Sequence, residues 1–82
     1  MVVKKQDQLT VDAMNYGTRY TVWYMREGVM RVASGVMKRL FLARGERADD
    51  DKNHLQQFIA LGDKNAKIDT RDITAICKEV GP

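Results

Sequence analysis

The chain has 82 residues, 44% of them hydrophobic and 30% charged, with a net charge of +3 and a single cysteine, Cys77. A chain of this length forms one small domain that buries only about 60% of its unfolded surface, so its core is marginal. One cysteine excludes an intrachain disulfide, and with the one histidine, His54, it leaves a four-ligand zinc site incomplete. We therefore expect no metal or cofactor, and self-association remains as a source of stability.

The N-terminal region lacks the features of a targeting segment. Lys4 and Lys5 are followed by polar residues instead of the apolar run of a signal peptide. No stretch of the sequence approaches the roughly eighteen apolar residues that a membrane span requires. We expect a cytoplasmic protein without a membrane partner, with a flexible tail at 1–8 and a single helical domain at 9–80.

Charge is distributed unevenly along the chain. Residues 1–44 hold eight Lys and Arg against three Asp and Glu (8 − 3 = +5), and residues 45–82 hold six against eight (6 − 8 = −2). A polyanion would therefore meet the first half of the chain. Ordinary surface charge that serves solubility is the alternative interpretation.

Apolar residues between positions 9 and 44 recur at the spacing of an α-helix. Ten residues follow one another at steps of three or four positions and fall within a stripe about 80° wide. The pattern predicts an all-α fold that begins with one long helix at about 9–44, about 50 Å in length. The stripe comprises Val11, Met14, Thr18, Val22, Met25, Val29, Val32, Val36, Leu40 and Ala43.

The same region also supports a β-hairpin near 18–33, within an α+β fold. The residues at 20–24 are of types that favour strands, and a short loop with Gly28 in a left-handed conformation could join two strands. From Tyr20 to Met25, however, only Thr21 is polar, whereas a half-buried strand alternates apolar and polar residues. The helix is therefore the favoured prediction.

Two shorter helices are expected after the long helix, which would end at Gly45. Asp49, Asp50 and Asp51 would cap the first of them, and Gly62 would end it. Asp69 or Thr70 would cap the second, which would run to about 80. The apolar faces of these two helices would comprise Leu55, Phe58 and Ile59 in the first and Ile73, Ile76, Cys77 and Val80 in the second.

A basic face of the long helix is the candidate nucleic-acid site. Small residues between cations allow a phosphate backbone to approach closely while Arg and Lys contact its oxygens. A solvated surface without a ligand is the alternative interpretation. The candidate residues are Arg31, Ser34, Gly35, Lys38 and Arg39.

The aromatic residues between positions 16 and 24 are the candidate interface. Two short helices cannot cover a long helix that is apolar on two sides, so a homodimer is expected to bury the remaining aromatic face. Small residues along the helix would allow a second backbone to pack closely. The candidate interface residues are Tyr16, Tyr20, Trp23, Tyr24 and Gly28.

The sequence contains no arrangement typical of a catalytic site. His54 stands alone, and no nucleophile, metal-ligand or phosphate-loop spacing appears. We expect a small non-enzymatic regulatory or accessory protein that binds DNA as a homodimer. The alternative is a protein–protein interaction module, such as an inhibitor, an adaptor or an assembly subunit, that docks through the aromatic face.

Overall fold

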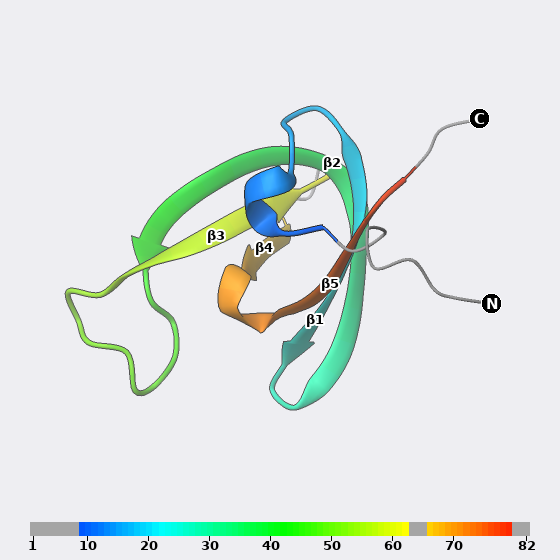
Figure 1. The fold of residues 1–82 in the computed structure, drawn as a ribbon. Helices are drawn as coiled ribbons and strands as arrows, with labels where there is room; N and C mark the ends of the chain where they lie inside the picture. Colours follow the sequence, from blue (N-terminus) through cyan, green and yellow to red (C-terminus); the bar gives the residue numbers. More distant parts are fainter. Residues whose placement is uncertain (1–8, 63–65, 80–82) are drawn as a thin grey trace.

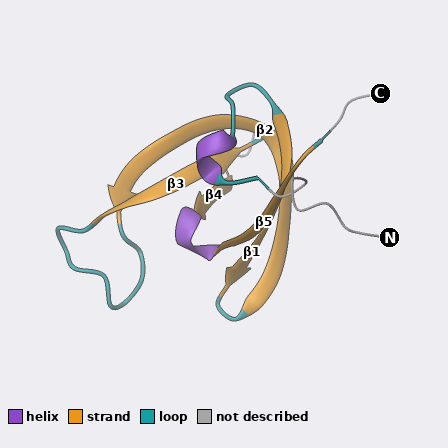
Figure 2. Ribbon diagram, in the orientation of Figure 1, coloured by secondary structure: helices purple, strands orange, loops and turns teal. Residues whose placement is uncertain are grey.

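The computed structural model describes residues 9–62 and 66–79, so the predicted tail at 1–8 and Val80 lie outside the described residues. The described chain is one antiparallel sheet whose five strands stand in the order β4-β3-β2-β1-β5 (Figures 1 and 2). Two single-turn 3₁₀ segments accompany the strands. The elements are η2 Val11–Ala13, β1 Arg19–Arg26, β2 Val29–Arg44, β3 Leu55–Leu61, β4 Ala66–Asp69, η3 Thr70–Asp72 and β5 Ile73–Lys78.

The predicted all-α fold with a long helix at 9–44 is wrong. That region forms η2 and then the β1–β2 hairpin, in which Arg26 pairs with Val29 across a two-residue turn. Glu27 and Gly28 in the turn have φ of 54° and 76°. Positive φ at both central residues gives a tight turn whose twist matches that of the flanking strands. The hairpin considered as the alternative near 18–33 is therefore present, although no α-helix accompanies it among the described residues.

The sheet bends sharply within β2, the longest strand. The first part of β2 pairs with β1 and the second part pairs with β3, and the register shifts between Met37 and Arg39. The bend carries β2 from the hairpin over to β3 and curls the sheet around its core (Figure 1). A bulge of this kind increases local twist and allows a single strand to serve both halves of a curled sheet.

The inner side of the curled sheet holds the hydrophobic core. Strand alternation directs every second side chain of each strand into it. Its buried members come from all five strands and from Met14 after η2, and η2 lies against the same core through Val11. The core comprises Met14, Tyr20, Val22, Met37, Ile59, Leu61, Ile68 and Ile76.

Both predicted short helices are also wrong. Residues 49–54 form a loop, and the apolar residues that follow it belong to β3, where Phe58 and Ile59 are buried on opposite sides of the strand. Asp69 does cap the segment after it, because its carboxylate accepts a hydrogen bond from the Arg71 amide, but that segment is only η3. The chain then continues as β5, in which Ile76 is buried and Cys77 is half-buried.

Candidate protein-interaction surfaces

The residues predicted to bind nucleic acid do not share one face. All five lie on β2, where successive side chains alternate between the inner and the outer side of the sheet. Arg31 is therefore on the opposite side from Ser34. Gly35 is buried in the bend, Lys38 lies at the register shift, and Arg39 follows on the outer side. The single basic helix face on which the prediction depended does not exist.

The residues predicted to form an interface are also separated. Tyr20 is 1% exposed and belongs to the core, and Tyr24 packs against that core from the same side of β1. Tyr16 is exposed in the turn before β1, and Gly28 lies in the hairpin turn. Of the five residues, Trp23 alone has its side chain on the outer side of β1.

Trp23 belongs to a continuous apolar surface on the outside of the hairpin, which we call the outer hairpin face: Trp23, Met25, Met30 and Val32. Trp23 pairs with Val32 across the two strands, and Met25 pairs with Met30. Met30 is 50% exposed and Val32 is 56% exposed. The Met30 sulfur lies 3.8 Å from the Thr74 hydroxyl on β5, so this side chain reaches across β1 and joins three strands into one surface.

A polar cluster forms one end of the outer hairpin face. The Thr21 and Ser34 hydroxyls are 2.9 Å apart, and Thr21 Oγ1 donates to the Glu79 carboxylate. Arg19 Nε donates to the same carboxylate over 3.0 Å. The hydrogen bond from Thr21 and the one from Arg19 lower the pKa of Glu79. Glu79 thus remains an anion, and its carboxylate is bound to β1 through Thr21 and Arg19.

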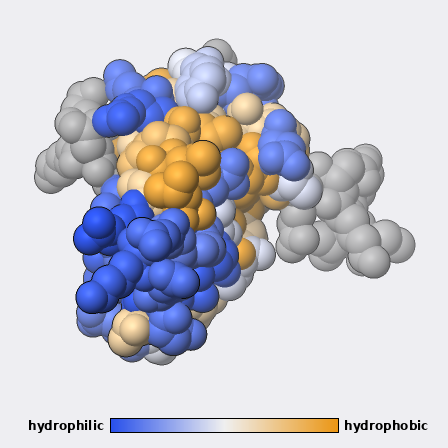
Figure 3. All heavy atoms as spheres, turned by 90° about the vertical axis from the view of Figure 1, so that its left-hand side faces the viewer, coloured by the Kyte–Doolittle hydropathy of each residue, from blue (hydrophilic) through white to orange (hydrophobic). Residues whose placement is uncertain are grey.

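A second apolar area lies on the inner side of the sheet, beyond the core. Leu42 on β2 and Leu55 at the start of β3 are each 63% exposed. They are diagonal neighbours, because Leu42 pairs with Gln57 and Arg44 pairs with Leu55. Figure 3, which views the molecule from the left-hand side of Figure 1, shows a hydrophobic patch above a strongly hydrophilic region.

The outer side of β3, in contrast, is covered by side chains of the neighbouring strands. The Phe41 and Phe58 rings stack with their centroids 5.8 Å apart. The Arg39 guanidinium lies 4.7 Å from the Phe41 centroid, and the Lys67 ammonium lies 4.8 Å from the Phe58 centroid. Phe58 is fully buried in this way. These rings stabilise the sheet and do not form an open platform for stacking bases.

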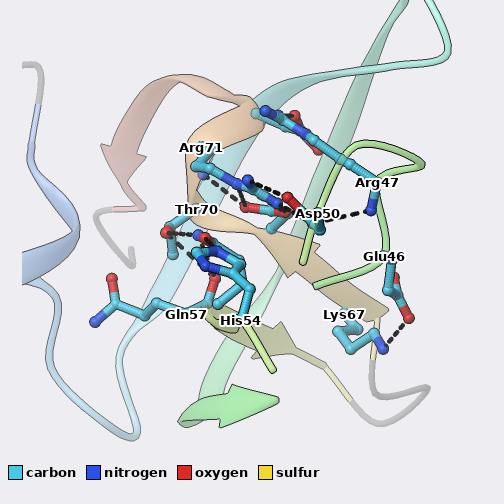
Figure 4. Close-up of polar contacts among 11 residues, drawn as sticks. Glu46, Arg47, Asp50, His54, Gln57, Lys67, Thr70 and Arg71 are labelled. Atoms are coloured by element: carbon cyan, nitrogen blue, oxygen red, sulfur yellow. Dashed lines mark hydrogen bonds and ion pairs between the residues drawn. The ribbon is translucent and has the colours of Figure 1, made fainter. Parts of the chain in front are cut away.

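Ion pairs fasten the loop between β2 and β3 to η3. Arg71 donates to Asp50 through both terminal nitrogens, each over 3.0 Å, and also to Asp69 (Figure 4). Arg47 pairs with Asp72 in the same area. Of the acidic triplet that was expected to cap a helix, Asp50 is the residue whose carboxylate is only 8% exposed and is paired with Arg71.

The protonation of this cluster follows from its geometry. Hydrogen bonds from Arg71 lower the pKa of Asp50 from 3.8 to about 2. Burial of the Asp69 carboxyl opposes ionisation, but hydrogen bonds from the Arg71 side chain and amide outweigh burial and lower its pKa. The two carboxylates in turn raise the pKa of Arg71. The cluster therefore stays ionised at neutral pH and holds the loop against η3.

Two further features are absent from the part of the chain that the structure describes, residues 9–62 and 66–79. In that part of the chain no group of three or more His, Cys, Asp or Glu side chains is placed to hold a metal ion. His54 shares a hydrogen bond of 3.1 Å with Gln56. None of the described helical segments has the length and apolar character needed to cross a membrane.

Comparison of the chain with family models, curated proteins and solved structures gave no match.

Proposed function

We propose that this protein is a non-enzymatic assembly module that pairs with a second copy of itself through the outer hairpin face. The observation that carries the proposal is the pairing of Trp23 with Val32 and of Met25 with Met30 on the outer side of the sheet. Exposed apolar side chains are common singly, but a contiguous group that is bordered by polar residues is typical of an interaction site. Trp and Met are also enriched in the centres of protein interfaces.

The charges at the ends of this face favour a second copy as the partner. The turn end carries Glu27, and the opposite end carries Arg19 and Glu79. Arg26 pairs with Val29 and therefore lies on the inner side of β1. In a two-fold arrangement with antiparallel hairpins, the turn end of one copy faces the opposite end of the other. Glu27 would then lie near Arg19 of the second copy.

The intrinsic fluorescence of Trp23 tests this proposal, because it is the chain's one tryptophan. Further burial of its partly buried ring in a dimer would shift the emission to shorter wavelength as the protein concentration rises. Light scattering on the same samples would show the mass doubling over the same concentration range. An emission spectrum and a mass that stay constant up to high micromolar concentration would refute the pairing.

DNA binding is the second candidate, and one observation favours it. β2 carries Arg31, Lys38, Arg39 and Arg44, all exposed, and contains no carboxylate. A strand with this composition could contact phosphates, although its cations alternate between the two sides of the sheet. Binding of mixed-sequence DNA that weakens steeply with salt, and that is lost in the Lys38→Glu/Arg39→Glu variant, would support this candidate. Binding by the outer hairpin face would depend little on salt.

A further inference from the structure

A cleft of about 300 Å³ lies at the turn end of the hairpin, away from the centre of the outer hairpin face. Its lining includes Tyr24–Glu27 and Lys67–Asp69 of β4. Glu46, Arg47 and Asp72 line it as well. The lining includes consecutive residues of β1 and of β4. Because successive side chains of a strand point to opposite sides of the sheet, a cleft that contacts consecutive residues lies along the edges of these two strands.

Both of these strand edges lack a partner strand in the described structure. β4 is the last strand of the sheet and pairs with β3 on one side only. β1 pairs with β5 as far as Tyr24, so Met25 and Arg26 have a partner strand on the β2 side alone. An unpaired edge presents N–H and C=O groups that can add a further strand. The cleft is thus a gap between two such edges.

The charges around the cleft are largely neutralised. Three cations and four carboxylates line it (3 − 4 = −1), and most of them pair with each other or with neighbours. Lys67 pairs with Glu46, Arg47 with Asp72, and Asp69 with Arg71. The cleft therefore has no excess positive charge for a phosphate or another anion. Its hydrogen-bonding edges suit an uncharged backbone, and Tyr24 and Met25 supply apolar surface.

The same ion pairs hold the walls in place before any ligand arrives. The ion pair of Glu46 with Lys67 connects the loop after β2 to β4, and the ion pair of Asp50 with Arg71 connects the same loop to η3 (Figure 4). A preformed site avoids part of the entropic cost of binding. β4 contributes three described residues to the lining of the cleft. An extended chain rises about 3.3 Å per residue, so a ligand segment of three to four residues matches this length.

We propose that this cleft binds an extended, uncharged segment of a partner protein, which adds a strand to the free edge of β4. Main-chain hydrogen bonds would provide most of the affinity, and one apolar side chain of the segment would contact Tyr24. The cleft shares Met25 with the outer hairpin face, but none of its other lining residues belongs to that face. It gives each copy of the protein a second binding site.

A random heptapeptide library, selected against the full chain, provides the probe. We expect selected peptides to be uncharged at their centre and to shift the NMR amide signals of Lys67, Ile68 and Asp69 on titration. Methylation of the central backbone nitrogens of a selected peptide should weaken its binding about tenfold or more, because it removes main-chain donors. Methylation of a terminal nitrogen of the same peptide serves as the control and should have little effect.

Altering the peptide avoids variants of β4 that would fail to fold. The Met30→Lys/Val32→Lys variant should bind the peptide as the wild type does, which separates this site from the proposed dimer face. The inference is overturned if no peptide is enriched, if the shifts fall on Met30 and Val32, or if central methylation leaves the affinity unchanged.

Discussion

Gly35 in β2 and Gly62 after β3 lie in direct backbone contact. A Cβ atom on Gly35 would be 2.9 Å from both the Cα and the amide nitrogen of Gly62. Gly62 has φ of 71°, and its amide donates a 2.8 Å hydrogen bond to the Val36 carbonyl. The end of β3 therefore packs against the bend of β2 at a distance that admits no side chain. The contact lies where β2 passes from its pairing with β1 to its pairing with β3.

Replacement of Gly35 by alanine should destabilise the fold by about 1–3 kcal/mol, because backbone atoms of Gly62 cannot move aside as a flexible side chain would. Urea denaturation followed by circular dichroism would measure the loss. Arg31→Ala, at an exposed position of the same strand, should change the free energy of unfolding by no more than about 0.5 kcal/mol. Equal stabilities for the two variants would contradict the close packing of the bend.

The Tyr20 hydroxyl should contribute to stability and not to self-association. It accepts a 2.7 Å hydrogen bond from the Asn15 amide, and the residue is buried in the core. Tyr20→Phe should therefore lower the free energy of unfolding by about 1 kcal/mol. Tyr16→Phe, at an exposed tyrosine, should have no measurable effect. A Tyr20→Phe variant with unchanged stability but an altered molecular mass would place this residue in an interface instead.

Acid should weaken the ion pair between Asp50 and Arg71 in a pH range set by the pKa of Asp50. The pKa of Asp50 is lower in the folded chain, about 2, than its ordinary value of 3.8. Its contribution is therefore complete above about pH 4 and is lost as the pH falls towards 2. Asp50→Asn should lower stability at neutral pH and flatten this part of the pH profile. Asp49→Asn is the control, and a profile that both variants leave unchanged would disprove the role of Asp50.

The failed helix prediction has a specific physical cause. The apolar residues of β1 lie on both sides of the strand: Val22 faces the core, whereas Trp23 and Met25 form the outer hairpin face. A strand that is apolar on both sides loses the alternation by which strands are recognised, and its residues can then match a helical spacing by coincidence. The strand propensity of residues 20–24 and the glycine at position 28 are the local signals that agree with the hairpin. The long apolar stripe favours the helix instead.

The sequence allowed part of the candidate surfaces to be predicted. Trp23 was selected as an interface residue because of its type, and the structure places it on the outer hairpin face. Met30 and Val32 were missed as interface residues, because only the hairpin register brings them beside Met25 and Trp23. The cleft along β4 could not be inferred, since it depends on which strand edges remain unpaired, and that is a property of the whole sheet order.

Sedimentation equilibrium on three proteins tests the proposed assembly most directly: the wild type, Met30→Lys/Val32→Lys, and Val29→Lys. Val29 is 53% exposed, nearly the same as Met30, but lies on the other side of β2 and serves as a matched control. We predict a dimer for the wild type and for Val29→Lys, and a folded monomer for the double variant. A monomeric wild type at high micromolar concentration, or a dimer that survives both lysines, would contradict assembly through the outer hairpin face.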